Sequence, residues 1–331
     1  MGSTFYRARI AGTGSYLPEK KLTNHDIEKM VETSDEWIRE RTGIASRSIA
    51  ADDQVTSDLA LIASERALEA ANLKATDIDA IFVATVSGDH IMPATSCVLQ
   101  RKLGCNHVMS VDLSAACSGF LYGMGIATDM IMTGRFKNIL VVGAEILHNF
   151  VDYTDRDTCI LFGDGAGAFI MSRAEEDQDS DVFSHHMQAD GYISHLLELP
   201  LGSAHPINKE NLDAGWHLMR MKGREVFKNA VRTMSSACKA SLEENKMQGS
   251  DIDWVVPHQA NVRILEAVAK MFGIPMEKVI VEIENMGNTS SATIPVAFDK
   301  AVRDGRIKRG QNLLFTAFGA GMTSGSLLMR Y

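Results

Sequence analysis

Apolar residues along this chain follow two alternating patterns, which predict helices that alternate with buried strands. Short apolar runs bounded by turn residues, such as residues 138–143 and 312–317, predict strands inside a sheet. Longer stretches with helical periodicity predict helices, including those at residues 57–72, 119–133, 224–244 and 264–272. Because strands that alternate with helices form sheets covered by those helices, the pattern predicts an α/β fold.

The order of these elements repeats within the chain. Residues 67–82, ALEAANLKATDIDAIF, align without gaps with residues 241–256, SLEENKMQGSDIDWVV, and the two strand runs named above align at the same offset. Either match alone is weak, because helix–turn–strand units resemble one another in many α/β proteins. Two matches at one offset favour a duplication. We therefore expect an N-terminal half, residues 1–173, and a C-terminal half, residues 174–331.

One glycine-rich string could be mistaken for a phosphate-binding loop. GDGAGA, at residues 163–168, lacks both the lysine and the strand-then-helix context that such loops need. We interpret it as a tight turn that leads into a strand.

Composition narrows the class of protein. Hydrophobic residues make up 45% and charged residues 23% of the 331 residues, as in soluble globular enzymes. The net charge of -9 disfavours nonspecific nucleic-acid binding, and no apolar stretch reaches the roughly 18 residues of a membrane helix. The first residues lack a signal-peptide layout, and the five cysteines show neither CxxC nor metal-ligand spacing. We therefore expect a cytoplasmic protein without a metal site, a nucleic-acid partner or a membrane partner.

Cys117 is the cysteine whose surroundings suit a nucleophile. It lies in DLSAACSGF, between a predicted strand at residues 107–113 and a predicted apolar helix that begins near Gly119. The positive end of a helix dipole lowers the pKa of a thiol, and small neighbours let a substrate approach. A buried, inert cysteine is the equally weighted alternative from this segment alone.

Two polar residues at other strand ends could join this cysteine. His258 follows the strand of the second repeat, in VVPHQANVR, and Asn288 lies in ENMGNTSSAT, near the position that the duplication makes equivalent to the Cys117 loop. A structural histidine is the commoner interpretation of His258 alone. The three residues together favour a functional site at the centre of the duplicated fold.

At these residues the sequence resembles the β-ketoacyl-acyl carrier protein synthase III family, condensing enzymes of the thiolase-like fold. The similar strings extend over nearly the whole chain: GTGSYLP at 12–18, SDEWIRERTGI at 34–44, AACSGF at 115–120, ILFGDGAGA at 160–168, PHQAN at 257–261, GNTSSAT at 287–293 and FGAGMTSGS at 318–326. The resemblance implies an internally duplicated fold with α-β-α-β-α layers and two mixed sheets. It also implies an obligate homodimer.

The resemblance further implies a catalytic triad of Cys117, His258 and Asn288 and a two-step reaction. An acyl-coenzyme A (acyl-CoA) first acylates Cys117, and the backbone amides of Cys117 and Ala320 form the oxyanion hole. Malonyl-acyl carrier protein (malonyl-ACP) then loses carbon dioxide, and His258 and Asn288 donate hydrogen bonds to the enolate oxygen. Attack on the acyl-cysteine gives 3-oxoacyl-ACP, the first condensation of type II fatty acid synthesis. Coenzyme A enters as a substrate, and no resident cofactor is expected.

The same resemblance assigns a coenzyme A site and a pocket gate. Trp37 and Arg156 would sandwich the adenine, and Arg41 would contact the phosphates. Asn261 and Gly223 would line the pantetheine channel. Met92 stands where many members have Phe, a position that caps the acyl pocket across the dimer interface.

A basic helix face offers a docking surface for an acidic carrier protein. Arg224 and Lys228 lie four residues apart on the predicted helix at 224–244, so they share one face. The family resemblance places Arg263 and Lys270 in the same surface. An ordinary solvated face is the alternative.

Three substitutions and one insertion depart from the family pattern. Asp157 replaces a usual Gly beside the coenzyme A site, Ala320 replaces the middle Gly of a triplet, and Met92 replaces Phe. An insertion at about residues 194–215 lengthens the loop before the basic helix. The alternatives left open are a related synthase with another primer or acceptor (quinolone, polyketide-starter or long-chain acyl), a cysteine hydrolase, and a noncatalytic acyl-binding scaffold.

Overall fold

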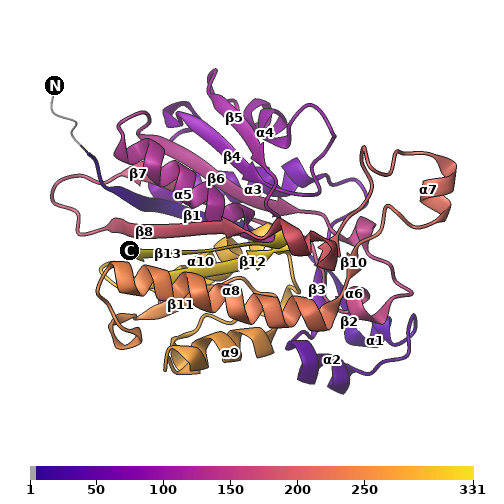
Figure 1. Cartoon of the computed structure of the whole chain (residues 1–331). Coiled ribbons are helices and arrows are strands. Elements are labelled where there is room, and N and C mark those ends of the chain that lie inside the picture. Colours follow the sequence, from indigo (N-terminus) through magenta and orange to yellow (C-terminus); the bar gives the residue numbers. More distant parts are fainter. Residues whose placement is uncertain (1–4) are drawn as a thin grey trace.

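Two mixed β-sheets form the centre of the molecule. This computed structural model describes residues 5–331. The first sheet has the order β1 (Ala8–Tyr16), β7 (Gly165–Arg173), β6 (Asn138–Glu145), β4 (Ala80–Ala84) and β5 (Met109–Leu113). The second has the order β8 (Asp181–Ala189), β13 (Thr323–Arg330), β12 (Asn312–Gly319) and β11 (Trp254–Pro257). Figure 1 shows the two sheets one above the other.

The second sheet repeats the pairing of the first. β4 pairs in parallel with β6, β6 pairs antiparallel with β7, and β7 pairs antiparallel with β1. In the same order, β11 is parallel to β12, β12 antiparallel to β13, and β13 antiparallel to β8. A single parallel bridge between Val255 and Val279 stands where β5 pairs with β4 in the first sheet.

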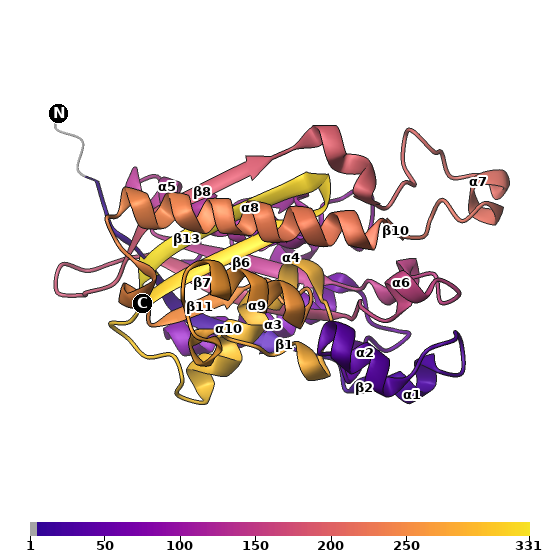
Figure 2. The ribbon, with the colours of Figure 1, turned by 60° about the horizontal axis from the view of Figure 1, so that its bottom comes forward.

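Helices cover both sheets and separate them. α5 (Gly119–Met132) and α10 (Thr293–Arg303) pack on strands of both sheets and so lie between them. α3 (Thr56–Ala71) and α4 (Thr95–Leu103) cover the outer face of the first sheet, while α8 (Gly223–Glu244) and α9 (Val262–Met271) cover that of the second, as Figure 2 shows. The layers are therefore α-β-α-β-α, and the predicted fold class is confirmed.

The remaining elements are short. Strands β2 (Lys20–Thr23) and β3 (Ser46–Ile49) pair with each other, as do β9 (Leu197–Glu198) and β10 (Arg220–Met221). The short α-helices are α1 (Asn24–Ile27), α2 (Asp35–Thr42), α6 (Arg156–Cys159) and α7 (Lys209–Asp213). Single 3-10 turns occur at Ala75–Asp77, Ala116–Ser118, His148–Phe150, Gly191–Leu196, Gly249–Asp251, Met276–Lys278, Ile283–Asn285, Ser290–Ala292 and Ala320–Met322.

The four predicted helices are present as α3, α5, α8 and α9, with ends within two residues of those predicted. The GDGAGA string turns into β7 as expected. The insertion at residues 194–215 is not simply a longer loop: it includes β9 and α7, where the Asn208 side chain caps the helix by accepting from Asn211 N at 2.8 Å. In Figure 1 the segment with α7 extends away from the sheets.

The boundary between residues 173 and 174 falls between β7 and β8. One hydrophobic core joins side chains of both sheets with α5 and α10, including Phe169, Phe298 and Phe315. The division into two halves stays a prediction. In the part of the chain from residue 5 onward, no helix combines the length and apolar character needed to cross a membrane.

Close packing at Gly143 gives a test of this core. A Cβ atom at this position of β6 would lie 2.4 Å from the backbone oxygen of Ser291. We expect Gly143→Ala to lower the free energy of unfolding by about 1–3 kcal/mol, because the backbone on both sides must shift. Thermal unfolding of the two proteins measures the difference.

Gly202→Ala is the matched control, because a Cβ atom there meets nothing within 4 Å. Its free energy of unfolding should stay within about 0.5 kcal/mol of the original protein. Equal unfolding temperatures for the two variants would contradict the close packing of β6 against the Ser290–Ala292 turn.

Candidate active site

Cys117 lies in the 3-10 turn that leads from β5 into α5, at the centre of the molecule. Its side chain is 6% exposed. Burial raises the pKa of its thiol to about 12, and the negative charge of Glu145 also raises it, whereas a hydrogen bond with the Ser290 side chain lowers it. The free thiol is therefore protonated at neutral pH.

The expectation that the helix dipole lowers this pKa needs correction. A helix N-terminus stabilises an anion by about 0.3–2 kcal/mol. The rise in the pKa of Cys117 to about 12 corresponds to about 4 kcal/mol. Burial therefore outweighs the dipole, and the resting thiol needs a proton acceptor to become a thiolate.

The two backbone segments predicted to form the oxyanion hole lie next to each other. A Cβ atom at Gly319, the last residue of β12, would come within 2.7 Å of the backbone nitrogen of Cys117. The Thr323 hydroxyl lies 2.9 Å from the Ala115 carbonyl and 3.1 Å from that of Ala320, so it joins these segments. Cys117 and Ala320 line one cavity, and their pairing as an oxyanion hole stays a prediction.

Asn288 is held so that its amide nitrogen is left for the cavity. Its side-chain Oδ1 accepts from the backbone N–H of Ser290 at 2.9 Å. Its backbone N–H donates to Leu161 O at 2.8 Å, and its backbone oxygen accepts from Gly163 N at 3.1 Å. The Oδ1 atom is thus engaged, and the side-chain NH₂ is the free donor.

His258 follows β11 and is buried beside α10. Desolvation lowers the pKa of its imidazole to about 3, so the ring is neutral at neutral pH. Its Nδ1 atom lies 2.6 Å from the hydroxyl oxygen of Thr293, which lies 3.0 Å from Ser290 O. The Thr293 hydroxyl donates its one hydrogen to Ser290 O, so its oxygen is left to accept from Nδ1–H. The ring proton sits on Nε2, from which it can be donated to a substrate, only when the hydroxyl turns from Ser290 O to Nδ1.

Thr293, Ser290 and Glu145 are functional candidates that the sequence reasoning missed. Two signals could have indicated them. The string NTSSAT places four hydroxyl side chains at one predicted strand-to-helix junction, and Glu145 is an acid that ends an otherwise apolar strand.

Two cavities meet at Cys117. The larger, about 620 Å³, extends from Cys117, His258 and Asn288 past Gly223 and Asn261 to Trp37 and Arg41. The smaller, about 450 Å³, also includes Cys117. Its lining combines the apolar side chains of Leu147, Leu199 and Met219 with the polar side chains of Glu198 and Thr323. Most of the predicted site residues therefore share one continuous space.

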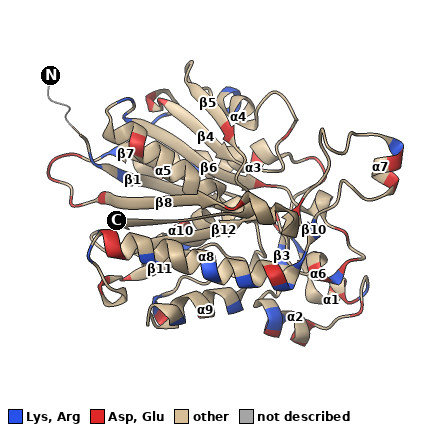
Figure 3. Cartoon of the chain, viewed as in Figure 1, with Lys and Arg blue, Asp and Glu red and all other residues tan. Residues whose placement is uncertain are grey.

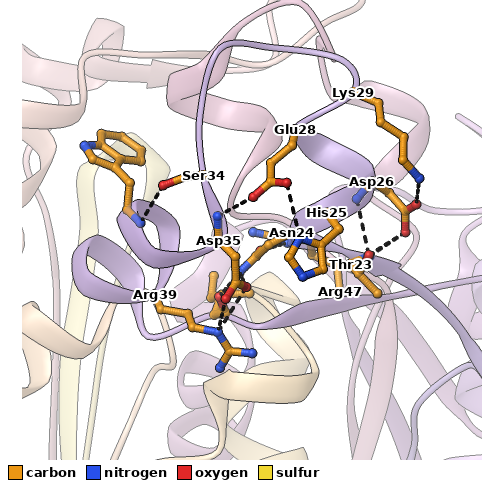
Figure 4. Close-up of polar contacts among 12 residues, drawn as sticks. Thr23, Asn24, His25, Asp26, Glu28, Lys29, Ser34, Asp35, Arg39 and Arg47 are labelled. Carbon is orange, nitrogen blue, oxygen red and sulfur yellow. Dashed lines mark hydrogen bonds and ion pairs between the residues drawn. The ribbon is translucent and has the colours of Figure 1, made fainter.

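Helix α2, which carries Trp37 and Arg41, is fixed by a polar network shown in Figure 4. Ser34 caps the helix by accepting from Trp37 N at 3.2 Å. The Asp35 carboxylate accepts from Arg39 at 2.8 Å and from Asn24 at 2.8 Å. The buried Arg47 guanidinium donates to Asn24 Oδ1 at 2.5 Å and thereby anchors the network in the core.

Arg156 lies beside Trp37, but not at the spacing of a sandwich. Its guanidinium carbon is 4.8 Å from the centroid of the Trp37 ring, and that of Arg41 is 5.5 Å away. Arg156 thus lies over the Trp37 ring, with no room for a third ring between the two side chains. Asp157, in the first turn of α6, lines the same cavity and adds a negative charge there.

The basic residues predicted for docking surround the mouth of the larger cavity. Arg224, Lys228 and Arg263 line it, and Lys270 lies farther along α9. Figure 3 marks Lys and Arg positions in blue along α2, α8 and α9. Among residues 5–331, none of these four side chains forms an ion pair with a carboxylate.

Met92 is the predicted site residue that lies apart from the others. It is 85% exposed, and it lines neither of the two cavities that meet at Cys117. Within a single chain it therefore gates nothing. In the described residues, no group of three or more His, Cys, Asp or Glu side chains could hold a metal ion.

Comparisons with known proteins identify the family. Profiles described as 3-oxoacyl-[acyl-carrier-protein (ACP)] synthase III and its C-terminal region match residues 111–191 and 242–331. The β-ketoacyl-[acyl-carrier-protein] synthase III of Alkalilimnicola ehrlichii is 50% identical over 98% of this chain and 99% of its own length. That of Xanthomonas campestris pv. campestris is 52% identical over 98% of each.

A solved structure agrees with these relatives. The crystal structure of 3-oxoacyl-[acyl-carrier-protein] synthase III from Aquifex aeolicus has a TM-score of 0.91 and 45% identity, covering 98% of this chain and 100% of that one. Sequence and fold thus agree over almost the whole length, and the chain belongs to the 3-oxoacyl-[acyl-carrier-protein] synthase III family.

Proposed function

We propose that this chain catalyses the condensation that initiates fatty acid synthesis, from acyl-CoA and malonyl-ACP to 3-oxoacyl-ACP, coenzyme A and carbon dioxide. The observation that carries this proposal is the position of Cys117 between two cavities. The cavity with basic residues at its mouth suits a long, charged carrier of the acyl group, and the leucine and methionine side chains of the second cavity suit the acyl chain itself. Both substrates of a two-step reaction could use the first cavity in turn.

In the first step the Cys117 thiolate attacks the thioester carbon of acyl-CoA. Negative charge develops on the carbonyl oxygen, and the backbone amides of Cys117 and Ala320 stabilise it. Each such donor typically contributes about 3–4 kcal/mol to the transition state. The close contact of Gly319 with Cys117 N supports this pairing, since it places the two segments against each other. Coenzyme A then leaves, with the acyl group on sulfur.

In the second step, malonyl-ACP loses carbon dioxide and forms an enolate. Asn288 and neutral His258 are suited to stabilise its oxygen, because each supplies a hydrogen bond without a negative charge. The bond from Ser290 N to Asn288 Oδ1 supports this role by leaving the amide NH₂ as donor. For His258 to donate from Nε2, the Thr293 hydroxyl has to turn from Ser290 O and donate to Nδ1. The enolate carbon then attacks the acyl-cysteine.

Coenzyme A binding would use Trp37, Arg41, Arg156, Asn261 and Gly223. The Asn261 side chain donates to Arg41 O at 2.8 Å. This hydrogen bond links a residue predicted to line the pantetheine channel with one predicted to contact the phosphates. Since Arg156 lies against Trp37, an adenine would displace its guanidinium and then stack between the two side chains. Coenzyme A is thus a substrate, and the reaction needs no resident cofactor.

Two exposed features support a homodimer. Ile91 and Met92 are 92% and 85% exposed, which is unusual for adjacent apolar side chains, and β5 pairs with β4 alone. A second copy of the chain packed on this edge would cover both features. Met92 would then gate the acyl cavity of the partner subunit.

The other functions left open have less support. A cysteine hydrolase needs a basic imidazole beside the thiol, whereas the pKa of His258 is lowered to about 3. A noncatalytic scaffold would not need the hydrogen bonds that orient Asn288 and His258. No observation favours a related synthase that uses a different acyl acceptor.

The nucleophile can be identified by acylation in the absence of malonyl-ACP. Radiolabelled acyl-CoA alone should label one residue per chain, and Cys117→Ser should abolish both labelling and condensation. Peptide mass spectrometry locates the label. Cys238→Ser is the matched control, because Cys238 is also buried but lies outside both cavities. Label that persists in Cys117→Ser would exclude this assignment.

The roles of His258 and Asn288 can be separated by measuring the two half-reactions. Replacing either residue by Ala should lower condensation by about 10²-fold or more, with a smaller effect on acylation, because the enolate loses a donor. Since the pKa of His258 is about 3, the decarboxylation rate should also show no ionisation of His258 near pH 6–7. Equal losses in both half-reactions would mean that the donors do not act specifically on the enolate.

The docking surface can be tested by charge reversal. Lys228→Glu and Arg263→Glu together should raise the KM for malonyl-ACP, and added salt should reduce the difference, because both act on electrostatic attraction. Acylation by acyl-CoA should stay nearly unchanged. Steady-state kinetics with each substrate measures both effects.

Lys239→Glu is the matched control, because Lys239 is an exposed residue on the same helix, about 16 Å farther along it. Its KM for malonyl-ACP should change little. If the double variant lost as much activity with malonyl-CoA as acceptor, the surface would have a structural role and no docking role.

A further inference from the structure

Asp157 is a charged residue of the larger cavity that the proposed reaction has not yet used. A cleft lined by charge of one sign concentrates ligands of the opposite sign. Basic side chains at the mouth therefore favour an anionic ligand, whereas an acid at the same place opposes it. Within the described chain, the charged side chains that line this cavity are Asp157 and four cations, Arg41, Arg224, Lys228 and Arg263.

Asp157 lies beside the ring that the coenzyme A adenine is expected to contact. It is in the first turn of α6, directly after Arg156, whose guanidinium carbon lies 4.8 Å from the centroid of the Trp37 ring. Its backbone N–H donates to the Asp155 side chain at 3.0 Å, which fixes this turn. Consecutive Cα atoms are about 3.8 Å apart, so the acid follows the α6 side of the ring closely.

The negative charge of Asp157 is not neutralised by direct contact with a cation. Asp157 is exposed, and among residues 5–331 its carboxylate forms no ion pair. Side chains of consecutive helical residues do not face each other, so Arg156 is poorly placed to pair with it. The Arg156 guanidinium instead lies over Trp37 and donates to Glu32 O at 3.2 Å. An anion that enters the mouth therefore meets the full charge of Asp157.

The two substrates bring different charges to this mouth. Coenzyme A ends in a nucleotide with a diphosphate and a further phosphate on its ribose. The phosphopantetheine arm of a carrier protein has one phosphodiester and no nucleotide. Repulsion between like charges near a protein surface is strong enough to change an equilibrium constant severalfold. Asp157 therefore acts against the nucleotide of coenzyme A and much less against the uncharged pantetheine that both substrates share.

The contact of Arg156 with Trp37 acts in the same direction. Because the guanidinium already lies over the ring, an adenine has to separate the two side chains before it can stack between them. Arg41 also lies over this ring, with its guanidinium carbon 5.5 Å from the centroid. The nucleotide thus competes with existing cation–π contacts in addition to the repulsion by Asp157.

We propose that Asp157 is a specificity-determining residue that weakens the binding of the coenzyme A nucleotide and thereby speeds the exchange of coenzyme A for malonyl-ACP. The proposal rests on the function proposed above, in which both substrates use the larger cavity in turn. Acyl-CoA and free coenzyme A carry the same nucleotide, so tight binding of this nucleotide would hold the product in the cavity after acyl transfer. Such uniform binding does not accelerate the chemical step, whereas slow product release limits turnover.

The experiment is isothermal titration calorimetry of the full chain with free coenzyme A and with dephospho-coenzyme A, which lacks the ribose phosphate. Asp157→Asn should bind coenzyme A about three- to tenfold more tightly than the original protein, with a smaller gain for dephospho-coenzyme A. Added salt should reduce the gain, because it screens the repulsion. Coenzyme A binds here without reacting, so the measurement requires no catalytic activity.

Steady-state kinetics provides a second measurement. In Asp157→Asn the KM for acyl-CoA and the inhibition constant of free coenzyme A should fall by similar factors, since both ligands carry the nucleotide. The kcat/KM for acylation by an acyl-pantetheine should stay the same, because this donor has no phosphate. A change with acyl-pantetheine as large as that with acyl-CoA would show that Asp157 acts on the acyl transfer or on the fold, and would overturn the specificity role.

Two variants serve as controls. Asp157→Glu keeps the negative charge and should keep the weak binding of coenzyme A. Glu40→Gln removes one negative charge from an exposed residue next to Arg41 on α2 that does not line the cavity. Its affinity for coenzyme A should change by less than about twofold, because an exposed charge outside the cavity is screened by solvent.

The remaining outcomes separate this inference from the proposed function. Equal affinities of the original protein and Asp157→Asn for coenzyme A would overturn the role of Asp157 and leave the proposed reaction intact. An equal gain in Asp157→Asn and Glu40→Gln would show a general effect of net charge and overturn the role as well. If coenzyme A bound to neither the original protein nor Asp157→Asn, the coenzyme A step of the proposed function would fail together with this inference.

Discussion

The cost of burying a thiolate is the constraint on which the rest of the site depends. Cys117 lies between the two sheets, where burial raises the pKa of its thiol to about 12. Cys117 also lines both cavities, so the proposed acyl-enzyme would form where they meet. A helix dipole is too weak to reverse this cost. The nucleophile therefore has to be activated by specific short-range contacts, and the structure concentrates these in the turns around it.

The turn from Asn288 to Thr293 supplies most of those contacts. Ser290 N orients the Asn288 amide, Thr293 orients the His258 ring, and Ser291 contacts Glu145. The turn packs against β6. Because Gly143 has no side chain, the Ser291 backbone lies directly on this strand. A displacement of this one turn would disturb both proposed enolate donors and the surroundings of the thiol together.

The sequence predicted elements and residue types well, but not their energetics. Periodicity located α3, α5, α8 and α9 within two residues, because an amphipathic or wholly apolar helix has a distinct pattern. The duplication indicated that Cys117 and Asn288 lie near each other, and the family strings indicated Trp37 and Arg41. The burial of Cys117, the lowered pKa of His258 and the contact of Arg156 with Trp37 could not be predicted, since they depend on tertiary packing between segments far apart in the chain. The α7 segment was missed because its pattern spans only five residues.

The buried side chain of Arg47 connects the mouth of the larger cavity with the turn beside the thiol. This guanidinium is fully buried, and it hydrogen-bonds to Asn24 on one side and to the Ile160 carbonyl on the other. Asn24 holds Asp35 at the start of α2, while the segment after Ile160 pairs with Asn288 through the bridge at Phe162. Breaking either contact would leave a buried cation with fewer partners and lower the free energy of unfolding. For comparison, breaking a buried ion pair typically costs about 3–5 kcal/mol. The helix that carries Trp37 and the turn that carries Asn288 are therefore held in one geometry, so the distance from the cavity mouth to the thiol is fixed by the fold.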